Sequence, residues 1–439
     1  MLKIILLIFC CSLLSYAQGF TEQKDLVPIK SRYGFDVPRQ PAVNFNYFID
    51  APDKQSPILR LAVAVQNDYL QYTRTDSNFV ARFQISFTLV HNKKTLLTQT
   101  WQETTQTTDF KTTNSRRGFQ HRLYTVRFSK IDFADLANDT SGSALIEVRD
   151  LSSSRVYRSR RSFHAGIVSA QGKFSRTEIT FLADSQWVGN TPQPLSESYN
   201  TLDINSPYSV FCRAHFNGFD SVRVHIGLWA VTSKKDTLIE NHSLYLAAND
   251  KDLPLLYPLP FKQLDEGTYA VRITYMDKKG KELTRQVQKF YIRWFLKPLY
   301  LFRVDLAIRP MSYLLSKKEI AYAKSLSLPG LQKWFSAWWK KRDPTPQTSY
   351  NELLHEYFAR VSQAVVRYSN RFKEGWETDR GMIFLLYGKP DKIENGKYTS
   401  KSPPYLIWHY KKMAKILLLL IRNARACSNL LIKRKNKHV

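Results

Sequence analysis

The clearest β signal in the chain is the stretch Tyr269-Ala270-Val271-Arg272-Ile273-Thr274-Tyr275, in which β-branched and aromatic residues recur. A second run of this kind extends from Val287 to Ile292, and Asp277-Lys278-Lys279-Gly280 lies between the two. A polar segment ending in glycine, which tolerates a positive φ, is typical of the turn in a β-hairpin. The sequence therefore predicts an antiparallel hairpin here.

The segment just before this hairpin predicts the kind of sheet to which it belongs. Leu264-Asp265-Glu266-Gly267-Thr268-Tyr269 resembles a tyrosine corner, in which the tyrosine hydroxyl bonds to the backbone a few residues upstream of a late sandwich strand. True immunoglobulin domains have a disulfide cysteine where Val271 stands. We therefore expect residues 173–294 to form an immunoglobulin-like β-sandwich without that disulfide.

Upstream, residues 18–168 show the same alternation and predict a first immunoglobulin-like sandwich. Polar breaks such as His91-Asn92-Lys93-Lys94 separate its strands, and Ser169-Ala170-Gln171-Gly172 has the composition of a junction. The expected strands include Ile58 to Val65, Phe79 to Val90, Leu123 to Phe128, Ala144 to Val148 and Val156 to Phe163.

After Trp294 the pattern changes to a helical period. Residues 295–311 read as a linker, and residues 312–410 predict an α+β domain of about three helices and a short β-sheet. Ser316 and Glu319 predict a capping box for the first helix, and Ser349 and Glu352 predict one for the third. The second helix is expected after Pro329-Gly330. The whole chain is thus predicted to be multidomain, mainly β and then α+β.

The most specific motif follows the third predicted helix. It is Gly375-Trp376-Glu377-Thr378-Asp379, followed by a run from Met382 to Asp391 that contains Gly388 and Pro390. Together with Asp343-Pro344 upstream, these residues resemble the GWxTD domain family. The resemblance implies a strand at Met382, β-rich regions ahead of the domain, and an exported protein of a Bacteroidetes-like bacterium. It implies no activity.

The motif residues have a structural and a functional interpretation. In the first, Gly375 and Gly381 permit tight turns, while Thr378 and Asp379 bond to backbone amides and so fix the loop. Asp379 and Arg380 could also pair with Arg342 and Asp343. In the second, the side chains of Asp343, Asp379, Arg380 and Asp391 converge in a cleft and form a carboxylate site. The candidate site residues are Asp343, Pro344, Gly375, Trp376, Thr378, Asp379, Arg380, Gly381, Gly388, Pro390 and Asp391.

No sequence motif identifies a catalytic residue, a metal ligand or a cofactor. His355-Glu356 begins like a metalloprotease motif, but Ala359 stands where the second histidine ligand would be. Cys212 and Cys427 lie in segments of different character, so they do not form a disulfide framework, although they could pair in principle. Cys212 lies in a strand-like run and reads as a small buried residue.

The N-terminus predicts export. Lys3 precedes a short apolar run from Ile4 to Leu14, and Ser15-Tyr16-Ala17 matches the small-residue pattern of a signal peptidase site. We expect residues 1–17 to be a signal peptide cut after Ala17, which places the mature protein in the periplasm or on the cell surface. An uncleaved N-terminal anchor is the alternative, but the apolar run is short for one.

The formal net charge of +28 bears on the partners. The basic residues are spread over the whole chain, and export argues against a nucleic-acid partner. Contact with an anionic envelope surface is one interpretation, and a charged, soluble surface is the other. We expect an exported binding or scaffolding protein whose partners are envelope proteins or glycans. The alternative is a hydrolase or transferase that acts on envelope glycan through the carboxylates around the motif.

Residues 411–439 contain no acidic residue and alternate between basic and apolar blocks. Ile416 to Ile421 is too short to cross a bilayer, so we expect no transmembrane helix in the mature chain. The segment from Met413 to Ile421 could instead lie on a membrane surface. The composition also suggests that this tail is out of frame, which independent sequencing of the DNA would test.

Overall fold

The computed structural model of the chain forms two compact units, Met1–Phe295 and Leu296–Val439. It describes residues 20–24, 26–50, 58–91, 93–127, 141–164, 174–183, 187–188, 191–192, 198, 200–216, 219–247, 253–396, 405–411, 415–420 and 431–434. The predicted signal peptide, residues 1–17, and Cys427 lie outside these ranges. The described part is mostly β, and most of its helices belong to the C-terminal unit.

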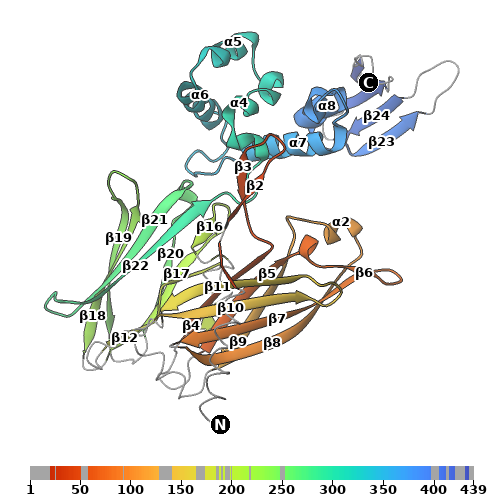
Figure 1. The fold of residues 1–439 in the computed structure, drawn as a ribbon. Helices are drawn as coiled ribbons and strands as arrows, with labels where there is room; N and C mark the ends of the chain where they lie inside the picture. The colour runs from red at the N-terminus through yellow and green to blue at the C-terminus, as the bar shows by residue number, and fades with distance from the viewer. Residues whose placement is uncertain are drawn as a thin grey trace. The chain divides into compact units, whose positions relative to one another are not determined.

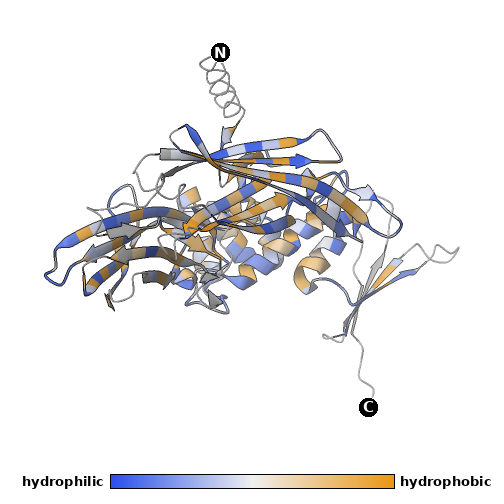
Figure 2. Cartoon of the chain, turned by 90° about the horizontal axis from the view of Figure 1, so that it is seen from below, coloured by the Kyte–Doolittle hydropathy of each residue, from blue (hydrophilic) through white to orange (hydrophobic). Residues whose placement is uncertain are grey.

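The first half of the N-terminal unit is built from two packed sheets (Figure 1). A six-stranded sheet contains β1 (Thr21–Glu22), β11 (Val156–His164), β10 (Ser141–Asp150), β7 (Phe79–His91), β6 (Thr73–Arg74) and β8 (Lys94–Thr107). A three-stranded sheet contains β4 (Val43–Asp50), β5 (Ile58–Gln66) and β9 (Phe119–Arg127). On β7, Phe83, Ile85 and Phe87 are fully buried while their neighbours are less so, which is the period-two pattern of a strand. Figure 2 shows this alternation along several strands.

The second half of the N-terminal unit is another pair of sheets. A four-stranded sheet contains β12 (Phe174–Arg176), β17 (Ser209–Phe216), β13 (Thr180–Leu182) and β20 (Leu253–Pro258). A five-stranded sheet contains β16 (Thr201–Asp203), β22 (Glu282–Arg293), β21 (Gly267–Met276), β18 (Ser221–Ala230) and β19 (Thr237–Ala247). The rings of Phe181 and Phe290 lie 5.0 Å apart, so the two sheets face each other. Cys212 is buried between them with its sulfur 3.3 Å from the Tyr275 hydroxyl, as expected for a small core residue.

The remaining elements of the N-terminal unit are short. The two-stranded pairs are β2 (Val27–Lys30) with β3 (Asp36–Arg39), and β14 (Trp187–Val188) with β15 (Thr191–Pro192). The single-turn helices are η1 (Asn67–Tyr69), α2 (Phe110–Thr113) and η2 (Phe261–Gln263).

The hairpin and the tyrosine corner predicted from the sequence are both confirmed. β21 and β22 pair antiparallel, and Gly280 in their turn has a φ of 80°. The Tyr269 hydroxyl donates a hydrogen bond of 2.9 Å to the carbonyl oxygen of Asp265. This bond ties the chain before β21 to the strand itself.

The two halves of the N-terminal unit are joined by a buried contact that the sequence did not suggest. Both faces of β5 are covered, because Ala62 packs with Leu182 and Phe211 of the second half. Beside them, the Arg213 guanidinium lies 2.5 Å from the Asp50 carboxylate, and both side chains are 2% exposed. The regions predicted as separate sandwiches thus form one compact unit.

The C-terminal unit begins with short helices that pack into the domain. The segment predicted as a linker, residues 295–311, folds into η3 (Leu299–Phe302), α4 (Val304–Ala307) and the start of η4 (Pro310–Tyr313). Tyr300, Ala307 and Met311 are buried. These residues therefore belong to the C-terminal unit and do not form a free connection.

Three longer helices follow, as predicted, but the second begins at Leu328 and not after Pro329-Gly330, because Ser327 caps it and the proline fits its first turn. They are α5 (Lys317–Ser325), α6 (Leu328–Lys340) and α7 (Glu352–Tyr368). The capping box of Ser316 and Glu319 is confirmed at α5. The prediction that Ser349 caps α7 is wrong, because the side chain of Asn351 accepts the hydrogen bond from the Leu354 amide instead.

The strand predicted at Met382 is also wrong. Residues Asp379–Tyr387 form helix α8, directly after the 3-10 turn η5 (Gly375–Glu377). Thr378 supplies an N-cap, and the apolar run that resembled a strand instead places Ile383, Phe384 and Leu385 in the core. A short apolar run is compatible with a strand or a helix, and here the N-cap at Thr378 favours the helix.

The chain ends in a C-terminal sheet of four strands. They are β23 (Lys392–Gly396), β24 (Tyr405–Tyr410), β25 (Lys415–Leu420) and β26 (Leu431–Arg434), paired in that order. Part of the basic and apolar tail, residues 415–420, therefore continues the sheet as strand β25. None of the helices among the described residues is long and apolar enough to span a membrane.

Candidate functional site

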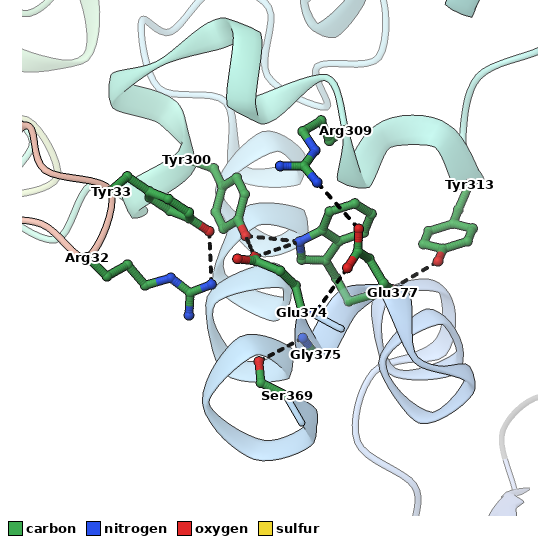
Figure 3. Close-up of polar contacts among 10 residues, drawn as sticks. Arg32, Tyr33, Tyr300, Arg309, Tyr313, Ser369, Glu374, Gly375 and Glu377 are labelled. Carbon is green, nitrogen blue, oxygen red and sulfur yellow. Dashed lines mark hydrogen bonds and ion pairs between the residues drawn. The ribbon is translucent and has the colours of Figure 1, made fainter. Parts of the chain in front are cut away.

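The motif residues form a turn and a helix start that pack on α7 (Figure 3). Gly375–Glu377 make up η5, and Thr378 is the N-cap of α8. The Thr378 hydroxyl donates to the Gly375 carbonyl at 2.7 Å and accepts from the Gly381 amide at 3.1 Å. This one side chain thereby closes η5 and begins α8.

Both glycines of the motif are required by close backbone contacts. A Cβ on Gly375 would lie 1.8 Å from the carbonyl oxygen of Ala364 in α7. A Cβ on Gly381 would lie 1.7 Å from the carbonyl oxygen of Gly375. No larger residue fits at either position without a backbone shift. The glycines therefore set how closely α7, η5 and α8 approach one another.

The Trp376 indole is buried and fully used in hydrogen bonding (Figure 3). Its Nε1 lies 2.9 Å from the Tyr300 hydroxyl and 3.1 Å from Oε2 of Glu374. The Tyr300 hydroxyl also donates to the same Glu374 oxygen. A buried indole N–H commonly needs such a partner. The three side chains therefore form a closed polar network inside the unit.

The variable position of the motif, Glu377, holds the other side of the turn. Its carboxylate accepts from the Glu374 amide at 2.9 Å and lies 3.4 Å from the Arg309 guanidinium. Arg309 is also 5.6 Å from the Trp376 ring centroid, within cation–π range. The Tyr313 hydroxyl donates to the Trp376 carbonyl at 3.0 Å. Burial, followed by the nearby charges of Glu377 and Asp379, raises the pKa of Tyr313, so this hydroxyl stays protonated.

The second glycine-containing turn ends α8 and leads to the sheet. Gly388 has a φ of 76°, where glycine is favoured, and its carbonyl accepts a 3.0 Å hydrogen bond from Tyr410 of β24. Pro390 is buried, and the Asp391 carboxylate accepts from the Lys411 amide at 2.7 Å. The Arg360 guanidinium of α7 donates to the Leu385 carbonyl at 3.0 Å and so satisfies the end of α8.

The predicted ion-pair cluster does not form. Asp343 lies in its own turn, where its carboxylate accepts from the Thr345 amide at 2.9 Å, and Pro344 beside it is exposed. Arg342 stacks on Trp338 at 3.5 Å, and Arg380 lies 5.7 Å from the Tyr368 ring. No contact within the described ranges brings the carboxylates of Asp343, Asp379 and Asp391 together.

Asp379 differs from the other motif residues. It is the first residue of α8, where a negative charge suits the helix dipole. Its Oδ2 atom is buried and makes no hydrogen bond with the described residues. The prediction that Asp379 bonds to a neighbouring backbone amide is therefore wrong for this oxygen, whereas the Thr378 hydroxyl does accept from the Gly381 amide.

The arrangement as a whole holds α7, η5 and α8 together. Its polar atoms are mostly directed at one another, and no group of potential metal ligands is found among the described residues. Sequence reasoning missed the partners of the motif; Tyr300, Arg309, Tyr313 and Arg360 are distant from it in the chain, whereas Ser369 and Glu374 lie just before it. These missed residues are Tyr300, Arg309, Tyr313, Arg360, Ser369 and Glu374.

The fold and the motif define an α+β domain whose signature turn is locked onto a long helix. The GWxTD domain family matches residues 268–421. The chain is therefore a GWxTD domain-containing protein. The match begins in β21, well before the residues 312–410 that carry the visible resemblance, and it includes β25.

Other comparisons add little. No curated protein matches the chain. A red sea bream transglutaminase aligns with a TM-score of 0.20 and 9% identity, over 58% of this chain and 32% of that one. A DUF4785 family protein of Legionella pneumophila gives 0.19 and 12%, over 57% of each chain. A β-D-mannosidase of Dictyoglomus thermophilum gives 0.20 and 11%, over 61% and 35%. The chain thus spans less than two thirds of the length of each of these proteins.

Proposed function

We propose that the protein is an exported binding or scaffolding component of the cell envelope, in which the GWxTD signature is a structural lock. The observation that carries this proposal is that Gly375, Trp376, Glu377, Thr378 and Gly381 all make internal contacts. A catalytic site leaves reactive atoms accessible to a substrate, whereas these atoms are engaged with one another. Export itself rests on the signal-like sequence of residues 1–17.

Binding would then fall to surfaces away from the signature. The paired sheets of the N-terminal unit are proposed to be immunoglobulin-like modules, which commonly bind partners through edges and loops. The tyrosine corner at Tyr269 supports this assignment.

Cross-linking mass spectrometry on intact cells tests the proposal. Lys341, Lys373 and Lys389 are exposed around the signature and available to a lysine-reactive reagent. Reproducible links from these lysines to one or a few envelope proteins would support a scaffold. Recovery of internal links alone, from a soluble monomer, would count against it.

The second candidate, a hydrolase or transferase acting on envelope glycan, has one observation in its favour. Oδ2 of Asp379 makes no hydrogen bond with the described residues, so this oxygen is not part of the hydrogen-bond network of the signature. Glycosidases commonly need a second carboxyl group about 5 to 10 Å away. The nearest motif carboxylate in sequence, Glu377, is already engaged by Arg309. An Asp379→Asn variant that folds normally but loses a measured glycan-cleaving activity would favour this candidate.

A further inference from the structure

The helix pair α5–α6 has a one-sided charge distribution. Residues 312–342 contain seven basic residues and a single acidic one, Glu319. The Glu319 carboxylate accepts from the Ser316 amide at 2.8 Å and from the Trp338 indole at 3.0 Å. Its charge is thus directed into the helix pair and does not neutralise the surface lysines.

The lysines of α5 point away from its buried residue. At 100° per residue, Lys317, Lys318 and Lys324 lie about 120°, 140° and 100° around the helix from the buried Ala323. All three are exposed, and none of them has an ion-pair partner within the described part of the chain. Lys333 on α6 is likewise exposed and unpaired there.

Two exposed apolar side chains accompany these charges. Tyr322 in the last turn of α5 is 55% exposed, and Leu328 at the start of α6 is 53% exposed. Only Leu326 and Ser327 separate the two helices, so Tyr322 and Leu328 flank the corner between them. We call the set Lys317, Lys318, Tyr322, Lys324, Leu328 and Lys333 the basic corner.

We infer that the basic corner binds an anionic lipid bilayer surface. Lysine ammonium groups attract anionic headgroups without fixed geometry, and tyrosine and leucine can enter the boundary between headgroups and acyl chains. An acidic protein groove would favour arginine forks, which this corner lacks. A soluble acidic polysaccharide would gain little from the exposed Tyr322 and Leu328. The inference rests on the proposed envelope location and goes beyond it by naming the surface and its ligand.

The inner faces of the two helices explain why the corner stays available. Leu331, Phe335, Trp338 and Trp339 of α6 are buried, so the main apolar face is used within the domain. Binding should therefore be mainly electrostatic, with two side chains adding a smaller apolar contribution. It should weaken strongly as ionic strength rises.

Vesicle flotation with the full chain tests the inference. The probes are vesicles of phosphatidylcholine alone and of phosphatidylcholine mixed with phosphatidylglycerol. The chain should float only with the anionic vesicles. A triple Lys317→Glu, Lys318→Glu, Lys324→Glu variant should bind them at least about tenfold more weakly, because each basic residue near such a surface contributes measurably.

A matched variant controls for bulk charge. Lys279→Glu, Lys281→Glu and Lys289→Glu make the same charge change at exposed positions on the β21–β22 hairpin and should leave binding nearly unchanged. An equal loss in both variants, or no loss in either, would overturn the inference. If the glutamate variant loses its thermal transition, the glutamine series at the same positions replaces it.

The apolar pair distinguishes a bilayer from a polysaccharide. Tyr322→Ser with Leu328→Ser should weaken vesicle binding several-fold while leaving its salt dependence unchanged. The lipid assignment would be overturned if the double variant bound vesicles as strongly as the wild type and a soluble acidic polysaccharide abolished this binding. Either result leaves the cross-linking test of the scaffold role standing on its own.

Discussion

A Cβ placed on Gly381 would lie 1.7 Å from the carbonyl oxygen of Gly375. The two signature glycines are thus in backbone contact with each other, and Gly375 in turn contacts Ala364 of α7. The signature allows the backbones of α7, η5 and α8 to approach closely. Substitutions in the signature should therefore lower stability.

Gly381→Ala should destabilise the C-terminal unit by about 3 kcal/mol or more, because the added methyl group must displace backbone. Denaturant unfolding followed by tryptophan fluorescence measures the change. Gly330→Ala in α6 is the matched control, since its Cβ would make only ordinary contacts, with the Ser327 hydroxyl at 3.4 Å and the Leu326 side chain at 3.7 Å. That control should be neutral or stabilising by up to about 1 kcal/mol. Equal effects at both positions would refute the packing argument.

Substitutions at the neighbouring residues Thr378 and Asp379 should have clearly different effects on stability. Thr378→Ala removes the N-cap of α8 and should cost about 1 to 2 kcal/mol, while Thr378→Ser should restore most of this. Asp379→Asn removes only a favourable charge at the helix start and should cost no more than about 1 kcal/mol. Urea titrations of the three variants measure the change in the free energy of unfolding. A larger loss of stability for Asp379→Asn than for Thr378→Ala would contradict the geometry.

Tyr300 and Trp376 should be energetically coupled. Tyr300→Phe leaves the indole N–H and the Glu374 carboxylate short of one partner and should cost about 1 to 3 kcal/mol. A double-mutant cycle with Trp376→Phe should give a coupling energy of at least about 0.5 kcal/mol. Additive effects within error would mean that the network does not act as a unit.

The buried pair Asp50 and Arg213 should dominate the stability of the N-terminal unit. Asp50→Ala removes the carboxylate that pairs with a guanidinium at a site that is 2% exposed, which should cost about 3 to 5 kcal/mol. Replacing both residues, as Asp50→Leu with Arg213→Met, should cost less than Asp50→Ala alone. Thermal unfolding of both variants provides the measurement, and the opposite order would show that the pair is not desolvated.

The fold could be predicted from the sequence where the signal was local. The turn at Gly280, the corner at Tyr269 and the capping box at Ser316 are all set by residues a few positions apart. The helix α8 was missed because Met382 to Tyr387 is a short apolar run that suits a strand equally well. The N-cap residue Thr378 was the sequence signal that could have distinguished the helix from a strand.

The candidate site was only half predictable, for a related reason. The sequence identified Gly375, Thr378 and Gly381 as structural, and their contacts agree with that interpretation. Tyr300 and Arg309, the partners of Trp376 and Glu377, lie more than sixty positions away from them in the chain. Asp50 and Arg213 are 163 positions apart, so the local sequence pattern of β4 or of β17 could not predict their contact.

Acid should loosen the start of α5 before it unfolds the domain. Hydrogen bonds from the Ser316 backbone and hydroxyl and from Trp338 lower the pKa of Glu319 from 4.5 to about 2. A carboxyl group with a lowered folded pKa stabilises the fold above its unfolded pKa, and this stabilisation is lost as the pH falls from about 4.5 to 2. Amide exchange at Glu319 and Ile320 should therefore accelerate in that window. A Glu319→Gln variant should lack this pH dependence, and an unchanged profile would contradict the assignment.

The central claim is that the signature holds α7, η5 and α8 together and is not itself a binding or reaction site. Hydrogen–deuterium exchange of the full chain, compared between the wild type and Thr378→Ala, tests it most directly. The account predicts faster exchange over α8 and the C-terminal half of α7, with exchange in the N-terminal unit unchanged. Unaltered exchange in α8, combined with loss of the cross-links to envelope proteins, would contradict it and make the signature a contact surface.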